Sequence, residues 1–331
     1  MSQLLEVDDL HVRFNLRDES LPAVDGLSCS LSKGETLGIV GESGCGKSVT
    51  ALSILRLIPE PPGVVTANAI RFDGVDLLRL SDIEMREIRG KQISMIFQEP
   101  MTSLNPVVKV GQQIGETFVL HEGLGRKDAR DRAIEMLRLV HIPEAERRID
   151  EYPHQLSGGM RQRVMIAMAL ACNPKILLAD EPTTALDVTI QAQVLELISE
   201  LREKLGTAVI LITHDMGVIA EHTERVIVMY AGKKVEEAEV NELFSTPCHP
   251  YTQGLLASIP RLDTGDAEDR TTLSEIEGIV PSLSDLGPGC AFAPRCPHAD
   301  ADCRSSCPPL EQKYPGHWAA CWHTDRLTES T

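Results

Sequence analysis

The stretch Gly41-Glu42-Ser43-Gly44-Cys45-Gly46-Lys47-Ser48 decides the fold, because it fits the pattern G-x-x-x-x-G-K-[ST]. A short buried strand is expected at Thr36–Val40, immediately before it, and a helix is expected to begin at Lys47. Glycines in such a loop let backbone N–H groups converge on a phosphate at the N-terminus of a helix. The segment therefore predicts a phosphate-binding loop.

Side chains of this loop have separate expected roles. Lys47 is expected to neutralise β- and γ-phosphate oxygens, and the Ser48 hydroxyl is expected to bind Mg²⁺. The Cys45 side chain is expected to face outwards from the loop. The remaining positions expected to contact the nucleotide are Gly41, Ser43, Gly44, Gly46 and Val49, together with the backbone of Cys45.

Further apolar runs indicate a parallel sheet around this loop. Buried strands are expected at Ile93–Phe97, Lys175–Asp180 and Ala208–Thr213, each followed by a helical or loop segment. Residues 4–14 and 23–31 are expected to form antiparallel strands. The polar, helix-periodic segment 110–150 predicts a helical subdomain inserted into this α/β core.

Two carboxylates end one of the apolar runs. Ile176-Leu177-Leu178-Ala179-Asp180-Glu181 is expected to be a buried strand that reaches solvent at its last residues. Asp180 is placed to hold the Mg²⁺ coordination shell. Glu181 is placed to orient or deprotonate an attacking water molecule. The pair alone could be a solvated strand end, so the interpretation depends on the other motifs.

Composition limits the possible location and partners of the chain. The net charge of −17, from 49 acidic and 32 basic residues, argues against a nucleic-acid partner. All apolar runs are far shorter than the roughly 18 residues that span a bilayer. The start Met1-Ser2-Gln3 shows no signal-peptide pattern, so we expect a cytoplasmic location.

A length of 331 residues suits one large domain and an appendage. After Val240 the composition shifts to Pro, Gly, Ser and Cys, and the charged stretch Asp263–Arg270 is expected to be a solvated linker. We therefore expect a domain over residues 1–240 and a C-terminal extension over residues 241–331.

The segment Leu156-Ser157-Gly158-Gly159-Met160-Arg161-Gln162-Arg163 opens a long predicted helix. Ser-Gly-Gly alone would be an ordinary helix cap. Between the two motifs above, however, Leu-Ser-Gly-Gly resembles the signature of ABC ATPases. The resemblance implies a P-loop NTPase fold with a RecA-like parallel sheet core, an antiparallel β subdomain, a helical subdomain over about residues 100–157 and a small Cys-rich C-terminal extension.

In that family two such domains pair head to tail. The resemblance implies that Ser157, Gly158 and Gly159 contact the nucleotide of the partner domain. It also implies a Q-loop glutamine at Gln98 that reaches towards Mg²⁺ or the attacking water, a D-loop at Ala185-Leu186-Asp187 and a histidine at His214 that contacts the γ-phosphate. The adenine-stacking aromatic residue is expected at Phe14. Lys47, Gln98, Glu181 and His214 are thus the candidate catalytic residues for hydrolysis of ATP to ADP and phosphate.

Three classes of ABC ATPase remain to be separated. A genome-maintenance ATPase needs a long coiled coil between Ser48 and Leu156, and the sequence has no sustained heptads there. A soluble tandem-cassette protein needs two phosphate loops, and this sequence has a single one, at Gly41–Ser48. The transporter class therefore fits best.

One group of transporters is indicated by longer matches. The Q-loop of oligopeptide and dipeptide importer ATPases is resembled by Phe97-Gln98-Glu99-Pro100-Met101-Thr102-Ser103-Leu104-Asn105-Pro106. The same subfamily is resembled at Met160, where most ABC signatures carry Gln, and at His249-Pro250-Tyr251-Thr252. The resemblance implies a second, homologous ATPase, two membrane permeases and an extracytoplasmic peptide-binding protein, with this chain at the cytoplasmic face of the membrane. Nickel or another small solute is the alternative to a peptide. A soluble ABC ATPase outside transport is the third alternative.

Five of the nine cysteines lie between Cys290 and Cys321. Clustered thiolates in a segment too short to build its own core indicate a metal site. The resemblance implies a [4Fe-4S] cluster on Cys290, Cys296, Cys303 and Cys321; tetrahedral Zn²⁺ is the alternative, and unligated thiols remain possible. Cys307 is a fifth candidate ligand.

Overall fold

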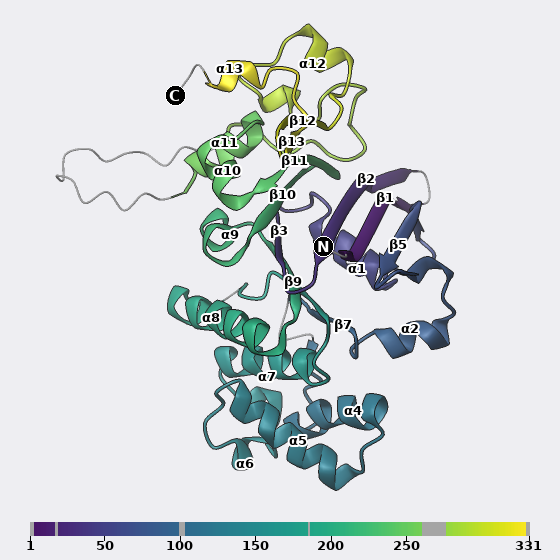
Figure 1. Cartoon of the computed structure of the whole chain (residues 1–331), viewed down its shortest axis with the longest axis vertical. Helices are drawn as coiled ribbons and strands as arrows, with labels where there is room; N and C mark the ends of the chain where they lie inside the picture. The colour runs from purple at the N-terminus through teal and green to yellow at the C-terminus, as the bar shows by residue number, and fades with distance from the viewer. Residues whose placement is uncertain (1–2, 17–18, 99–102, 185, 260–275, 329–331) are drawn as a thin grey trace, which may run out of the picture. The chain divides into compact units, whose positions relative to one another are not determined.

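The computed structural model describes residues 3–16, 19–98, 103–184, 186–259 and 276–328. Expectations for Met1-Ser2, Glu99–Thr102, Ala185 and Asp263–Arg270 lie outside these residues. The chain forms two compact units, whose helices and strands are labelled in Figure 1. Unit 1 contains Met1–Glu6, Ser30–Thr36 and Ile70–Ile212, and unit 2 contains Val7–Cys29, Leu37–Ala69 and Thr213–Thr331.

Unit 1 is built on parallel strands. The strands β7 (Ile93–Ile96), β8 (Ile176–Asp180) and β9 (Ala208–Thr213) pair in that order, with Ile93 opposite Ile176 and Ile176 opposite Ala208. Every residue of β8 and β9 is buried, as expected for strands that are covered on both faces. The predicted parallel core is confirmed, although β7 ends at Ile96, one residue before the expected Phe97, which is 42% exposed.

A helical cluster follows β7 in unit 1. Its helices α4 (Val110–Glu122), α5 (Arg126–Leu139) and α7 (Gly158–Leu170) pack against one another, and the short α6 (Ala145–Arg148) packs against α5. Figure 1 shows this cluster in teal. Helix α5 buries Ala129, Ala133, Met136 and Leu137, which recur at the spacing of one helix face. The helical segment expected over residues 110–150 is therefore present.

The other elements of unit 1 are short, apart from one long helix. Helix α8 (Val188–Leu205) packs against α7 and ends at Gly206, which adopts a left-handed φ of 68°. The remaining elements are β5 (Ala69–Phe72), β6 (Val75–Asp76), the 3₁₀ helix η1 (Leu77–Arg79), α2 (Asp82–Ile88) and the 3₁₀ helix η2 (Pro153–Gln155).

Unit 2 contains the antiparallel strands near the N-terminus. The strands β1 (Gln3–Asn15) and β2 (Ser20–Ser32) are neighbours in one sheet. Strand β1 also pairs antiparallel with β4 (Gly63–Thr66), from His11 opposite Thr66 to Phe14 opposite Gly63. Both early strands were predicted, and β4 was not.

The second sheet of unit 2 holds the strand that precedes the phosphate loop. Strand β3 (Thr36–Val40) runs parallel to β10 (Arg225–Tyr230), which pairs antiparallel with β11 (Lys233–Glu239). The C-terminal strands β13 (His317–Ala319) and β12 (Glu311–Tyr314) then continue the sheet beyond β11. The C-terminal segment therefore adds strands to this sheet, which its composition did not predict.

Short helices complete unit 2. They are α1 (Lys47–Ile54), α9 (Met216–His222), α10 (Val240–Ser245), α11 (Pro250–Ala257), the 3₁₀ helix η3 (Ala293–Arg295), α12 (Ala301–Ser305) and α13 (Asp325–Thr328). Tyr230, Tyr251 and Phe292 form an aromatic core, with ring centroids 4.7 to 5.4 Å apart. Across the described parts of the chain, no helix combines the length and apolarity that a bilayer span requires.

Candidate nucleotide-binding site

The phosphate loop of unit 2 lies between β3 and α1, as predicted. Gly41 has a φ of 154°, and a Cβ atom there would lie 2.2 Å from the carbonyl oxygen of Met229. Gly46 has a φ of 101°, and its Cβ would lie 2.4 Å from the carbonyl oxygen of Ala23. Only glycine fits at both positions. These close approaches set the curvature of the loop.

Lys47 lies inside this curve and is 5% exposed. Its ammonium Nζ donates to the carbonyl oxygens of Gly41, at 2.7 Å, and Glu42, at 3.0 Å. An ammonium group held among these carbonyls is a fixed positive charge at the N-terminus of α1. The loop thus offers the charge and the helix terminus that phosphate oxygens require.

The Cys45 side chain does not face outwards, so that prediction was wrong. Cys45 is 1% exposed, and its Sγ lies 3.7 Å from Lys47 Nζ. The Cys45 Sγ atom lies next to Gly41, 2.8 Å from the position that a Cβ on Gly41 would take. Burial raises the pKa of this thiol, so Cys45 acts as a small apolar filler.

The other predicted loop residues lie nearer to solvent. Ser43 and Gly44 are exposed, whereas Ser48 and Val49 are half-buried in the first turn of α1. Elsewhere in unit 2, His214 is exposed and directly follows β9. Phe14 is half-buried, and its ring approaches within 3.5 Å of the Cβ position of Gly63.

Unit 1 holds the two predicted carboxylates. Asp180 is the last residue of β8 and is 4% exposed. Glu181 follows it with a φ of 45°, a conformation that costs about 1 kcal/mol for a residue other than glycine. Its N–H donates to the carbonyl oxygen of Ile212 at 2.9 Å. Glu181 therefore lies in a left-handed conformation directly after the end of β8.

The Glu181 carboxylate is held by neighbours in the same unit. Gln98 Nε2 and Thr184 Oγ1 each donate to Glu181 Oε2 at 2.9 Å. The structure therefore brings the predicted Q-loop glutamine to the predicted catalytic carboxylate. Thr184 was not singled out in the sequence, although it lies three residues after Glu181.

The signature segment of unit 1 caps α7. Ser157 is the N-cap residue, and its Oγ accepts the N–H of Met160 at 3.3 Å. Gly158 is exposed, and a Cβ on Gly159 would lie 2.9 Å from Cγ2 of Ile190 on α8. Asp187 caps α8 in the same way, by accepting the N–H of Ile190 at 3.0 Å.

A groove lies beside these elements in unit 1. Its volume is about 280 Å³, and residues from β7, α4 and α7 line it. Phe97 and Leu120 are 42% and 69% exposed on its walls. The other lining residues are Gly90, Ser94, Met95, Ser103, Gln113, Glu116, Thr117, His121, Met165, Met168 and Ala169.

The structure brings the four predicted metal-ligating cysteines to one pocket of unit 2. Cys290, Cys296, Cys303 and Cys321 line it together with apolar side chains such as Phe292 and Ala293. Cys307 is exposed and lines an adjacent pocket, with its Sγ 3.9 Å from Lys233 Nζ. Cys321, rather than Cys307, therefore shares this pocket with Cys290, Cys296 and Cys303.

Electrostatics in this pocket disfavour free thiolates. Burial is the main cause that raises the pKa of Cys290, Cys296 and Cys321, and neighbouring thiols of the set raise each one further. Beside them, Asp300 pairs with His323 Nε2 at 2.7 Å and accepts the N–H of Cys303 at 3.2 Å. These bonds, the one from His323 first, lower the pKa of Asp300.

In the described part of the chain, two further groups of three side chains have the atom types that bind metal ions, and neither is the set of four cysteines. In each group the ligand atoms lie within 4.8 Å of one another: Asp300, Cys303 and His323 in one, and Glu236, Cys248 and His317 in the other. Neither group was predicted, because each includes a histidine that is at least 20 positions from its other members and belongs to no motif with them.

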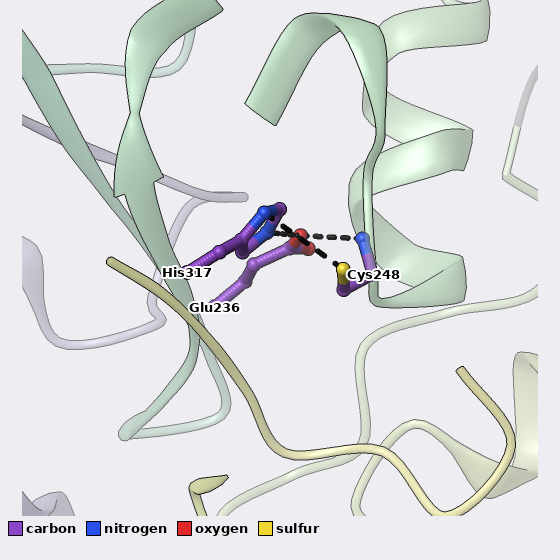
Figure 2. Close-up of side chains that lie close together, drawn as sticks. All are labelled: Glu236, Cys248 and His317. Carbon is purple, nitrogen blue, oxygen red and sulfur yellow. Dashed lines mark hydrogen bonds and ion pairs between the residues drawn. The ribbon is translucent and has the colours of Figure 1, made fainter. Parts of the chain in front are cut away.

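Figure 2 shows the buried group of Glu236, Cys248 and His317. The Glu236 carboxylate accepts His317 Nε2 at 2.7 Å and the backbone N–H groups of Cys248 and His249. Burial first, and the Glu236 carboxylate second, raise the pKa of the Cys248 thiol to about 12. Three N–H donors satisfy the hydrogen-bonding capacity of this carboxylate. The group therefore links β11 by hydrogen bonds to β13 and to the start of α11.

The comparisons with known proteins agree with this architecture. A family model described as ABC transporter matches residues 24–184, and a model described as oligopeptide/dipeptide transporter, C-terminal region, matches residues 235–303. The probable peptide ABC transporter ATP-binding protein y4tR of Sinorhizobium fredii is 54% identical over 98% of this chain and 96% of its own length. The oligopeptide transport ATP-binding protein AppD of Bacillus subtilis is 52% identical over 97% of each protein.

Solved structures give the same result. The dimeric post-hydrolysis state of the ATP-binding cassette MJ0796 bound to ADP and Pi has a TM-score of 0.64 and 30% identity, over 71% of this chain and 98% of that one. Fold and phosphate loop together define an ABC-type P-loop ATPase, as predicted. The chain belongs to the ATP-binding subunits of the oligopeptide/dipeptide ABC transporter family.

Proposed function

We propose that this chain binds and hydrolyses ATP to drive the uptake of dipeptides or oligopeptides through membrane permeases. The observation that carries the proposal is similarity along the whole chain: AppD and the dipeptide transport ATP-binding protein DppD of Bacillus subtilis are each 52% identical over at least 97% of it. The match of the second family model to residues 235–303 supports a peptide over nickel or another small solute.

The residues of unit 2 act on the phosphates. Backbone N–H groups of the loop and the Lys47 ammonium bind the β- and γ-phosphate oxygens, and the loop's fixed curvature keeps these donors oriented. The exposed His214 side chain contacts the γ-phosphate, and Phe14 stacks on the adenine. Both of these roles follow from the positions of the residues in the family's motifs.

The residues of unit 1 act on the attacking water. Glu181 orients the water and accepts its proton, and Gln98 holds the Glu181 carboxylate through its 2.9 Å hydrogen bond. Ser48 of unit 2 and Gln98 and Asp180 of unit 1 would supply oxygen ligands to Mg²⁺, which is a hard cation. Mg²⁺ supplies charge neutralisation when bound.

A second ATPase completes the reaction. In the head-to-tail arrangement of the family, Ser157, Gly158 and Gly159 contact the nucleotide of the partner, and Asp187 lies at the dimer interface. Solved dimers of the similar cassette MJ0796 support a dimeric assembly. We propose that the partner is a different, homologous chain.

The permeases dock on the groove of unit 1. Exposed apolar side chains such as Phe97 and Leu120 in a hollow of about 280 Å³ suit a short amphipathic helix. Docking there places the chain at the cytoplasmic face of the membrane, and an extracytoplasmic binding protein supplies the peptide. In this scheme residues 1–240 form the ATPase domain, with its helical subdomain at about residues 100–157, and residues 241–331 form the extension.

The four cysteines of the shared pocket fit a [4Fe-4S] cluster, because four thiols line one largely apolar enclosure. Cys290, Cys296, Cys303 and Cys321 would hold it, and it would cross-link a segment that has little core of its own. Zn²⁺ is the competing ion. A brown chain with four iron atoms supports the cluster, whereas a colourless chain with one zinc atom contradicts it.

The Glu181→Gln variant tests the catalytic assignment. We expect it to bind ATP normally and to lose about 100-fold or more of its turnover, because an amide cannot accept the proton of water. The measurement is ATP hydrolysis by the complex assembled with a partner ATPase whose own site is inactivated. Glu203→Gln, on an exposed surface of α8, is the matched control. Normal turnover in Glu181→Gln would contradict the role of Glu181.

Purification from membranes tests the transport assignment. We expect the full chain to co-purify with two permeases and a second ATPase, and ATP hydrolysis to rise when a peptide-loaded binding protein is added. A soluble homodimer with full activity and no permease would favour an ABC ATPase outside transport. Stimulation by nickel, and not by peptides, would favour the other solute.

A further inference from the structure

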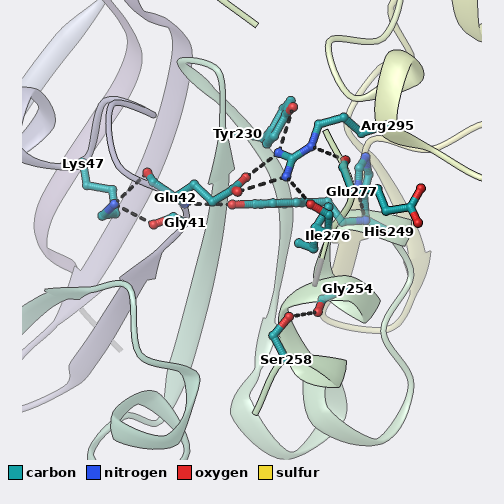
Figure 3. Close-up of polar contacts among 11 residues, drawn as sticks. Gly41, Glu42, Lys47, Tyr230, His249, Gly254, Ser258, Ile276, Glu277 and Arg295 are labelled. Carbon is teal, nitrogen blue, oxygen red and sulfur yellow. Dashed lines mark hydrogen bonds and ion pairs between the residues drawn. The ribbon is translucent and has the colours of Figure 1, made fainter. Parts of the chain in front are cut away.

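A side chain of the C-terminal extension reaches the phosphate loop within unit 2. The Arg295 guanidinium forms a two-pronged ion pair with the Glu42 carboxylate, at 2.7 Å and 3.1 Å. Figure 3 shows the guanidinium directed at Glu42, on the opposite side from Lys47. Paired N–H donors that face both carboxylate oxygens form the strongest geometry available to an arginine.

The backbone of Glu42 is held as firmly as its side chain. Its N–H donates to the hydroxyl of Tyr251 at 2.8 Å, and its carbonyl oxygen accepts Lys47 Nζ at 3.0 Å. Tyr251 is fully buried. The side chain, the N–H and the C=O of one loop residue are therefore each fixed by a different partner, and two of the partners lie beyond residue 250.

Arg295 is itself locked in place. Its side chain is 4% exposed, and it donates to the carbonyl oxygens of Ile276 and Glu277, each at 3.0 Å. The guanidinium carbon lies 6.0 Å from the ring centroids of Tyr230 and Phe292. A guanidinium with so many fixed contacts cannot follow a moving loop, so it holds the loop in one position.

The charges explain why such a contact matters for ATP. Glu42 is a carboxylate in a loop that binds phosphates, and an uncompensated negative charge there would repel the ligand. Arg295 supplies the compensating positive charge from a buried site, where bulk salt screens it weakly.

We propose that Arg295 is a positioning residue for ATP binding: through Glu42 it neutralises and orients the phosphate loop. This inference rests on the proposed binding of ATP by that loop. It gives the C-terminal extension a direct part in nucleotide affinity, since Arg295 belongs to the segment between Cys290 and Cys303. In this role Arg295 acts on the nucleotide through Glu42.

The test compares ATP affinity in variants of the full-length chain. Binding of a fluorescent ATP analogue with Mg²⁺ is measured for Arg295→Gln, Arg295→Lys, Glu42→Gln and the double variant Glu42→Gln/Arg295→Gln. We expect Arg295→Gln to raise Kd about tenfold, because it leaves the carboxylate uncompensated. The double variant should recover most of the lost affinity. Arg295→Lys keeps the charge but not the paired donors, so its Kd should lie between those of the wild type and Arg295→Gln.

Controls separate positioning from general damage. Arg304→Gln changes an exposed arginine of the same extension and should bind like the wild type. In the assembled transporter, Arg295→Gln should raise KM for ATP and retain kcat at saturating ATP. If Arg295→Gln does not fold, Arg295→Lys alone and with Glu42→Gln provides the same comparison.

Two results would overturn the inference: an Arg295→Gln variant with a Kd within about twofold of wild type, or a double variant that binds as weakly as the single one. Failure of the wild-type chain to bind the analogue would instead refute the proposed ATP function. The outcomes of the two proposals are thus distinct.

Discussion

The phosphate loop and the signature segment are both glycine-rich entries into a helix, yet they are built in opposite ways. In the phosphate loop, Gly41 and Gly46 adopt positive φ values, and backbone atoms crowd both positions. In the signature segment Gly158 is exposed, and the nearest atom to its Cβ position is 3.8 Å away. The phosphate loop is thus enclosed by backbone atoms at Gly41 and Gly46. The signature segment is open at Gly158 but not at Gly159, whose Cβ would lie 2.9 Å from Cγ2 of Ile190.

The phosphate loop carries its own cation, whereas the signature segment needs a second chain to form a complete site. The phosphate loop has a buried cation, Lys47, held by its own carbonyls. The signature segment offers a serine hydroxyl and the N-terminus of α7, with a side-chain oxygen that already caps the helix. An open helix N-terminus of this kind becomes a binding site when a second surface brings the phosphate to it. The comparison can be tested from both sides.

The largest effect is expected for Lys47→Ala. Loss of the buried ammonium removes a charge-assisted contact to phosphate, so Kd for ATP should rise about 100-fold, equivalent to about 2.7 kcal/mol. Equilibrium binding to the isolated chain measures this change, with the exposed Lys204→Ala as the control. Binding within about twofold of wild type would mean that the enclosed loop is not the nucleotide site.

A smaller effect on stability should distinguish the glycines. Gly46→Ala places a methyl group 2.4 Å from a backbone oxygen at a positive φ, and we expect it to lower the free energy of unfolding by about 2 kcal/mol. Gly158→Ala meets no such contact and should change that free energy by less than about 0.5 kcal/mol. Denaturant unfolding of both variants measures the contrast. Equal losses would show that the two loops are packed alike.

Ser157→Arg should lower the free energy of unfolding by about 1 kcal/mol, because it removes the cap that accepts the Met160 N–H. The chain's own ATP affinity should stay nearly unchanged, because Ser157 is exposed and serves the partner's site. A bulky cation there should lower ATP turnover at the partner's site about tenfold, which a complex with only that site active would reveal. Weakened ATP binding to the variant chain itself would contradict the shared-site model. The exposed Lys204→Ala is again the control.

Much of the fold was predictable because its signals are local. Strands β3, β8 and β9 are continuous apolar runs, and each leads into a motif whose residue types fix the backbone, as at Gly41–Ser48. Helices α4 and α5 show the 3.6-residue period over several turns. In such segments the chemistry of neighbouring residues determines the structure.

The features that sequence analysis missed depend on distant residues. Arg295 and Glu42 are separated by 253 positions, and neither belongs to a pattern that names the other. The burial of Cys45 depends on space left by Gly41 and by the nearby Met229 backbone. Strands β12 and β13 are too short to show an alternating period. Tertiary packing, rather than propensity, decided all of these.

The pairing of β13 with β11 has a consequence for how the protein is made. Strand β11 is synthesised well before residues 317–319, which form its partner strand β13. During synthesis that edge of the sheet is therefore unpaired. The Glu236 carboxylate also lacks one of its hydrogen-bond donors at that stage, because that donor is the His317 side chain. Until then an open strand edge is available to other chains. Residues 317–319 therefore cover this strand edge only after they have been synthesised, and a chain truncated before them would leave β11 open to aggregation.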